Sequence, residues 1–226
     1  MVFEVSPQAL ARHFRRALLD ARRLDTPYRH WRLVEVLPAA VAQALISLPI
    51  APPLIDDCGG VRDLDNSKRC FLTPALQADF PVCAALAEAL QRPDAALLAG
   101  ETCGFVAEGA HLRIEYIQDL DGAWLRPHCD VPEKLCSMVI YLCTGPHASD
   151  WGTDIYDSGL RPIGRSSATF NSATIFVPGP NTWHGFDKRP IRGVRRLLEI
   201  NYVHPSWRDR NQLCFPQRPI CPSAAG

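Results

Sequence analysis

The sequence lacks an excess of charge of either sign, because 24 lysines and arginines are balanced by 24 aspartates and glutamates over 226 residues. A nucleic-acid surface needs clustered positive charge, so this balance argues against a nucleic-acid partner. Long apolar runs are also missing. No stretch approaches the roughly 18 residues of a membrane-spanning helix, so we expect no membrane partner. The first residues include Glu4 and lack the long apolar segment of a secretory signal, so we expect a cytoplasmic location.

The cysteines follow no metal-binding pattern, although nine are present. Their number is odd, their positions are scattered and no Cys-x-x-Cys pair occurs, so we expect no structural zinc site. Reduced thiols in a cytoplasmic protein fit this pattern best. Cys136 and Cys143 fall within apolar segments and are interpreted as small core residues.

Length and composition favour one domain covering residues 1–226, since 47% hydrophobic and 21% charged residues are ordinary for a globular protein. Residues 1–102 are mainly helical in pattern, with apolar positions recurring every three or four residues. Residues 103–204 consist of short apolar runs separated by glycine and proline, which is typical of an antiparallel β-sandwich or barrel. We expect helices at 8–24, 38–48, 81–91 and 94–99, and strands at 31–37, 112–118, 124–128, 136–143, 153–156, 168–170, 173–177 and 194–203.

His128 and Asp130 stand two residues apart at the end of one predicted strand. Side chains at positions i and i+2 of a strand point to the same face, so an imidazole nitrogen and a carboxylate oxygen can converge on one metal ion. A lone His-x-Asp pair also arises often by chance, and taken alone it is better explained as a histidine and an aspartate on a polar strand edge. The pair therefore needs support from the rest of the chain.

His184 supplies that support. It follows the predicted strand 173–177 and a Pro-Gly-Pro turn, which brings the chain back. With His128 and Asp130 it would complete a two-histidine, one-carboxylate ligand set, the usual set of non-haem Fe(II) sites. Some ten residues later, Arg195 and Arg196 open another predicted strand. A buried arginine there would need an anionic partner, and a dicarboxylate ligand would provide one.

This ordered set resembles the 2-oxoglutarate/Fe(II)-dependent dioxygenases, and most closely their prolyl-hydroxylase-like branch. The resemblance covers residues 105–203, whereas the helical first half has the family's usual order of elements but no diagnostic motif. It implies an α+β fold, a double-stranded β-helix or jelly roll, with the N-terminal helices packed on the outer sheet.

The resemblance also implies roles for individual residues in binding 2-oxoglutarate. Arg195 matches the basic residue that binds the distal carboxylate, and Arg196 would replace it if the strand register were shifted by one residue. Arg192 is a third choice. Tyr141 matches a tyrosine that hydrogen-bonds the same carboxylate, although an ordinary core aromatic is an equal explanation, and Tyr116 is a weaker candidate of the same kind.

Two positions depart from the family pattern. Leu197 stands where several relatives have a small hydroxyl residue. Glu199 shares the strand face of Arg195, which is unusual beside an anionic cosubstrate. We expect Glu199 to pair with a basic residue or to bind substrate.

The implied activity uses Fe(II), bound by His128, Asp130 and His184, with 2-oxoglutarate and O2 as cosubstrates and ascorbate as a supporting reductant. Asp130 favours hydroxylation, since family halogenases lack this carboxylate, and desaturation or epimerisation are variants. Residues 56–70 predict a polar loop over the pocket, and Trp151, Asp154 and Tyr156 are expected on its rim. Charges of both signs there favour a polar small metabolite or amino-acid-like substrate. A peptidyl residue such as proline is the alternative substrate.

Two other classes of protein stay open at this stage. One is a metal-binding cupin-type isomerase or sensor without oxygenase activity, which would not need an arginine placed for 2-oxoglutarate. The other is a scaffold that only binds partners, against which an intact ligand set argues. The sequence gives no indication of the oligomeric state.

Overall fold

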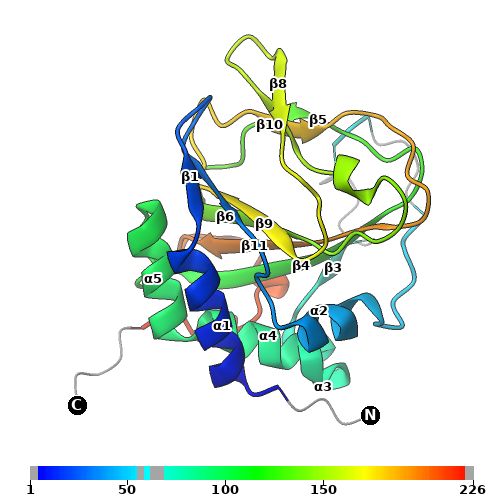
Figure 1. Ribbon diagram of the computed structural model, residues 1–226. Coiled ribbons are helices and arrows are strands. Elements are labelled where there is room, and N and C mark those ends of the chain that lie inside the picture. The colour runs from blue at the N-terminus through cyan, green and yellow to red at the C-terminus, as the bar shows by residue number, and fades with distance from the viewer. Residues whose placement is uncertain (1–4, 55–58, 62–68, 222–226) are drawn as a thin grey trace.

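Two antiparallel sheets face each other in the computed structural model, which describes residues 5–54, 59–61 and 69–221 (Figure 1). The larger sheet has the strand order β1-β2-β9-β6-β11-β4-β3, and the smaller has the order β5-β10-β7-β8. The α-helices lie on the outer side of the larger sheet (Figure 1). This confirms the expected double-stranded β-helix with helices packed on its outer sheet.

Most strands belong to the second half of the chain, although β1, β2 and β3 join the larger sheet from the first half. The helices are α1 (Pro7–Leu19), α2 (Ala39–Ile46), α3 (Pro74–Asp79), α4 (Pro81–Gln91) and α5 (Pro93–Cys103). The strands are β1 (Arg22–Leu24), β2 (His30–Leu33), β3 (Cys70–Phe71), β4 (His111–Asp119), β5 (Leu125–His128), β6 (Lys134–Tyr141), β7 (Asp154–Tyr156), β8 (Pro162–Arg165), β9 (Ser172–Phe176), β10 (His184–Phe186) and β11 (Arg195–Val203).

Helix α1 begins where Ser6 caps it, since the serine hydroxyl accepts a hydrogen bond from the amide of Ala9. Its apolar stripe, which includes Leu10 and Phe14, is fully buried against the sheet and the other helices. The helix ends at Leu19, before the predicted end at residue 24, because residues 22–24 pair with β2 as an edge strand.

The side chains of strand β11 alternate between the two faces of the larger sheet. Leu198, Ile200 and Tyr202 point outward and are buried in the core that the helices cover. Each such side chain contributes about 1.5–3 kcal/mol to stability by leaving water. Leu197 and Glu199 point inward and line a cavity between the two sheets. The helices therefore support the sheet from behind, and the inner face is left for function.

Several short elements differ from the prediction. Residues 168–170 were expected to form a strand but do not, and β3, β8, β10 and α3 were not predicted. Elements of two to six residues contain too few positions for a periodic pattern to show. None of the helices in the described ranges is long and apolar enough to cross a bilayer.

The chain after β11 folds back along the larger sheet. Leu213 forms a β-bridge with Arg113 of β4, and the amide of Cys214 donates to the carbonyl of Leu112. A short 3-10 helix, η4 (Arg210–Gln212), precedes this bridge. We predicted an irregular tail, and the segment is largely irregular, yet it also forms one wall of the inner cavity.

Candidate metal centre and cavity

His128 and His184 face each other across two strands of the smaller sheet. They are direct register partners of β5 and β10, and their ring centroids lie 4.3 Å apart. Gly185 lets the strands approach this closely, because a Cβ atom there would lie 2.7 Å from the carbonyl oxygen of Leu125. The two histidines, 56 positions apart in the sequence, are thereby brought together.

Both imidazoles are oriented in the same way. Nδ1 of His128 lies 3.0 Å from the carbonyl oxygen of Arg126, and Nδ1 of His184 lies 2.9 Å from that of Thr182. A carbonyl can only accept, so each Nδ1 carries the proton and donates. Nε2 is then the ring nitrogen of each histidine that is left as a ligand atom, an arrangement usual for metal-binding histidines.

Asp130 is held by two donors from β6. Nζ of Lys134 lies 2.6 Å from Oδ1, and the hydroxyl of Ser137 lies 2.6 Å from Oδ2. Oδ2 is also 3.9 Å from Nε2 of His184. Burial alone raises the pKa of Asp130, but Lys134 and His184 outweigh it and the net pKa is lowered. The carboxylate is therefore ionised and fixed in place.

The three side chains fit a divalent metal ion. One ligand atom from each of His128, Asp130 and His184 lies within 4.8 Å of the others, so all three can reach one ion. Burial lowers the pKa of His184 to about 4, so its imidazole is neutral near pH 7 and can donate an electron pair. The structure thus brings together the three side chains that the sequence predicted as metal ligands.

A cavity of about 680 Å³ extends inward from this cluster, between the two sheets. Arg195 lines it and is itself buried. Its Nε donates to the carbonyl of Trp151 at 2.6 Å, and its Nη1 binds Asp119 at 2.5 Å. The guanidinium also stacks on the ring of Phe186 at 3.9 Å. Its Nη2 makes no hydrogen bond within the described residues and is the nitrogen left for a ligand.

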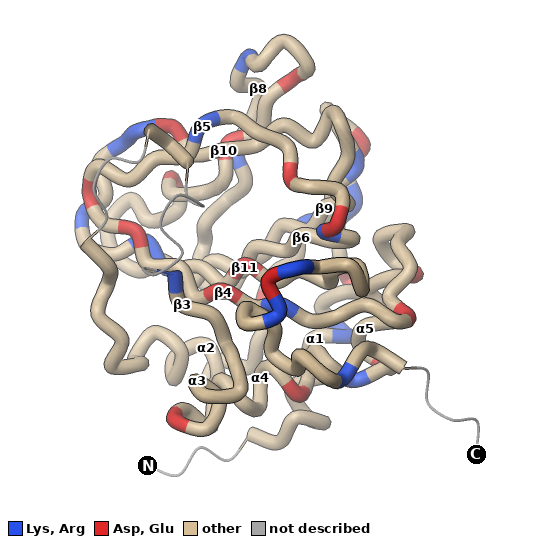
Figure 2. The backbone as a smooth tube through the Cα atoms, turned by 180° about the vertical axis from the view of Figure 1, so that it is seen from behind, with Lys and Arg blue, Asp and Glu red and all other residues tan. Residues whose placement is uncertain are grey.

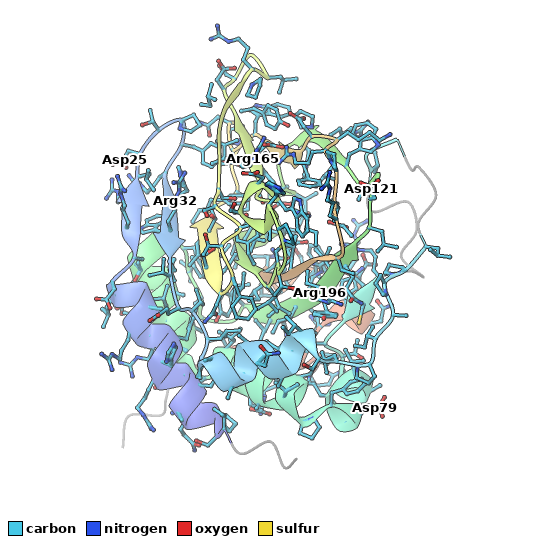
Figure 3. All side chains as sticks on the ribbon, turned by 45° about the vertical axis from the view of Figure 1, so that its right-hand side comes forward. Asp25, Arg32, Asp79, Asp121, Arg165 and Arg196 are labelled. Carbon is cyan, nitrogen blue, oxygen red and sulfur yellow. The ribbon has the colours of Figure 1, made fainter. Side chains whose placement is uncertain are left out.

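The other predicted cosubstrate residues lie outside the cavity lining. Arg196 points to the opposite face of β11, toward the side that carries α2 (Figure 3), where it binds Gln118. Tyr141 is fully buried, and its hydroxyl bonds Thr153 and Ser166. Thr153 lines the cavity in front of it. Arg192 is exposed in the loop before β11, and Tyr116 donates to the carbonyl of Leu45 on the helix side.

The pocket rim also differs from the prediction. Trp151, Asp154 and Tyr156 were expected there but are 1–2% exposed and lie outside the cavity lining. Trp151 donates its indole N–H to the carbonyl of Pro190, and Asp154 binds Arg165 and Arg189. The Tyr156 hydroxyl donates to Asp187, so all three side chains hold β7 and its neighbouring loops together. Most of the predicted loop 56–70 lies outside the described residues.

A charged wall continues from Asp130 across the inner face of the larger sheet. Lys134 bridges Asp130 and Glu199, with contacts of 2.6 Å to each. Glu199 is 3.8 Å from Arg113, which pairs with Glu115 at 2.9 Å, and Glu115 also pairs with Arg69 at 2.6 Å. Figure 2 shows acidic and basic segments beside the labels of β3, β4 and β11. We call Lys134, Glu199, Arg113, Glu115 and Arg69 the charged wall.

Sequence reasoning anticipated two members of this wall: Glu199, as a residue that would pair with a basic partner or bind substrate, and Arg69, as part of the polar loop 56–70 over the pocket. The others carried a usable signal: in residues 112–118, Arg113 and Glu115 alternate with apolar residues, so both face inward. Lys134 lies four residues after Asp130, but nothing local predicted that it would turn back to contact it.

Comparisons with known proteins bear on the fold. Neither the protein-family models nor the curated proteins contain a match. Among solved structures, a prolyl 4-hydroxylase from Phytophthora capsici has a TM-score of 0.59 at 13% identity, covering 91% of this chain and 69% of that chain. A Trichoplax adhaerens prolyl hydroxylase, solved with a hypoxia inducible factor peptide fragment, has a TM-score of 0.55 at 10% identity, with coverages of 87% and 90%.

A third similar structure is an oxidoreductase of the 2OG-Fe(II) oxygenase family from Burkholderia pseudomallei. Its TM-score is 0.54 at 16% identity, and the match covers 90% of this chain and 93% of that chain. These likenesses show that the chain shares the fold of these proteins. Function does not follow from fold, so it must be argued from the site.

Proposed function

We propose that the chain is an Fe(II)- and 2-oxoglutarate-dependent dioxygenase that hydroxylates an unactivated C–H bond of a polar small metabolite or amino-acid-like compound. One observation carries this proposal. His128, Asp130 and His184 converge at one end of a cavity, and Arg195 lines the same cavity. Bound iron, with 2-oxoglutarate and O2, would supply the oxidising chemistry, and the protein would supply position and shelter.

The metal would be held by Nε2 of both histidines and one oxygen of Asp130. Lys134 and Ser137 restrain the carboxylate, so its orientation does not depend on the metal. A two-histidine, one-carboxylate set leaves coordination positions open for cosubstrate and O2. The carboxylate at Asp130 also occupies the position that a halide would need, so we propose hydroxylation as the outcome.

The distal carboxylate of 2-oxoglutarate would bind Arg195. Its Nη2 provides a charge-assisted hydrogen bond, and the backbone contact and the Asp119 pair fix the guanidinium. Ile117, Leu197 and Phe186 give the cavity apolar walls that exclude water around the carbon chain. Tyr141 would not contact the carboxylate itself but would orient the Thr153 hydroxyl, which lines the cavity.

The direct test is succinate formation from 2-oxoglutarate by purified protein supplied with Fe(II) and ascorbate. Calorimetry of 2-oxoglutarate with the Zn(II)-loaded protein measures cosubstrate binding without turnover. Metal binding without 2-oxoglutarate binding would favour a cupin-type protein, and neither would favour a scaffold. Asp130→Ala should abolish succinate formation, and an unchanged rate would remove Asp130 from the ligand set.

A further inference from the structure

The part of the cavity beside the charged wall supplies none of the proposed ligands of the metal or of 2-oxoglutarate. Its lining includes Lys134, Glu199 and Arg113, together with Arg126 and Arg208 at the more exposed mouth. Lys134 connects Glu199 to Asp130, because its Nζ lies 2.6 Å from a carboxylate oxygen of each. A compound bound to this wall therefore lies next to the proposed metal centre. This is the position that the primary substrate must take.

Within the part of the chain that the structure describes, the buried charges of this region are balanced. Asp130, Glu199 and Glu115 oppose Lys134, Arg113 and Arg69, and Arg195 is matched by Asp119. A divalent metal ion and the dianion of 2-oxoglutarate add equal and opposite charge. A ligand with net charge would therefore leave that charge uncompensated in a partly buried site, which is unfavourable. The wall favours a ligand that is neutral overall.

Glu199 nevertheless has an unused acceptor. Its Oε1 accepts from Lys134, whereas its Oε2 accepts no hydrogen bond within the described residues, and the side chain is 15% exposed on the cavity. An ammonium group of a ligand would give Oε2 a charge-assisted partner. An apolar ligand would exclude water from Oε2 without giving it a new hydrogen bond, which is unfavourable.

Two arginines at the mouth complement this acceptor. Arg126 lies on β5 and Arg208 lies on the C-terminal segment, and both side chains line the cavity. Neither makes an ion pair or a side-chain hydrogen bond within the described ranges. A carboxylate entering the cavity would meet one of these guanidinium groups, which suit carboxylates by their planar pair of donors.

We propose that the primary substrate is a small zwitterion, a free amino acid, whose ammonium binds Glu199 and whose carboxylate binds Arg208 or Arg126. This inference rests on the proposed dioxygenase function and names its substrate class. The cavity volume of about 680 Å³ also lies within the range usual for small-molecule sites. A peptide lacks both free termini at the reacting residue and cannot make this pair of contacts.

The experiment measures succinate release by the iron-loaded protein with a panel of the common free L-amino acids. Each is compared with its N-acetyl and C-amide derivatives and with short proline-containing peptides. At least one free amino acid should stimulate succinate release, and blocking either terminus should abolish the stimulation. Stimulation by peptides alone, or by no free amino acid while basal 2-oxoglutarate turnover persists, overturns the substrate class. Absence of both turnover and 2-oxoglutarate binding overturns the proposed function instead.

Variants then assign the two ends of the substrate. Glu199→Gln should raise the KM for the amino acid about ten-fold or more, the loss expected for a hydrogen bond between charged groups. Glu133→Gln, an exposed acid of the same cavity, is the matched control and should change it little. Zn(II) affinity is measured in parallel, because Glu199 contacts Lys134. An unchanged KM in Glu199→Gln overturns the ammonium site.

Arg208→Gln and Arg126→Gln test the carboxylate end at exposed positions where folding is not at risk. At least one of them should raise the KM about ten-fold while leaving 2-oxoglutarate affinity unchanged. Arg22→Gln, on the exposed edge strand β1, is the control. If neither mouth variant differs from this control, the carboxylate assignment is overturned.

Discussion

Lys134→Met removes the only cation that contacts Asp130 within the described residues. Nζ of Lys134 lies 2.6 Å from Asp130 and 2.6 Å from Glu199, and its side chain is 13% exposed. Removing one partner of a buried ion pair costs about 3–5 kcal/mol, because the remaining charge is left uncompensated. We expect the free energy of unfolding of the metal-free variant to fall by about this amount at pH 7. Urea unfolding with a chelator present measures it.

The pH dependence of this loss has a definite sign. Burial raises the pKa of Glu199, but Lys134 and Arg113 hold it well below its usual 4.5, and Asp130 is likewise lowered from 3.8. A carboxylate with a lowered pKa stabilises the folded state above its unfolded pKa and loses this contribution as pH falls through the folded pKa. The difference between wild type and Lys134→Met should therefore shrink as the pH falls below about 4.

A double variant and a control at an exposed cation show whether the loss of stability comes from uncompensated buried charge. Lys134→Met/Glu199→Gln removes one uncompensated charge and should recover part of the lost stability. Arg22→Met changes a cation that is exposed on the edge strand β1, and should alter stability by no more than about 0.5 kcal/mol. A loss in Lys134→Met as small as that in Arg22→Met would refute the idea that the charged wall is electrostatically coupled.

Two further predictions follow from the placement of single side chains. Arg195→Met should weaken 2-oxoglutarate binding to the Zn(II)-loaded protein about ten-fold or more, whereas Arg196→Met, on the helix side, should change it little; equal losses by calorimetry would contradict the assignment. Burial lowers the pKa of His30 below 6.5, so only the unfolded state takes up its proton just below that pH, and the fold is destabilised as the pH falls. His30→Gln should flatten this decline in urea unfolding, and an unchanged slope would exclude His30 as its source.

The fold was predictable where strands are long and have one apolar face. Residues 112–118 and 194–203 place charged residues between apolar ones, because one side meets the helix-covered core and the other meets the cavity, and residues 136–143 form an apolar run of strand length. Strand β10 holds only three residues, so no alternation can show in it. Its His184 was found from the residue type and from the turn before it, which depend on local chemistry and not on periodicity.

The charge pairs that join neighbouring strands were not predictable, because their members are distant in sequence. Glu199 and Lys134 are 65 positions apart, and Arg195 and Asp119 are 76 apart. Parity along a strand fixes which face a side chain takes, and it placed Arg195 and Glu199 correctly on one face. Which partner each would meet depends on strand order and register, and these are set by the packing of the whole sheet.

The pair of Arg195 with Asp119 explains how the sheet holds a buried guanidinium before any ligand binds. Asp119 is its direct register partner on β4, so the compensating charge is built into the sheet. A ligand carboxylate at Nη2 would then bind a guanidinium whose charge Asp119 already compensates, so it would not gain the large energy of pairing an uncompensated buried charge. In the proposed complex, the affinity of 2-oxoglutarate would therefore come from one charge-assisted hydrogen bond, from the enclosing apolar walls and from the metal at the other end. Lys134 compensates the charge of Asp130 in the same way, so neither buried charge depends on a bound ligand for its partner.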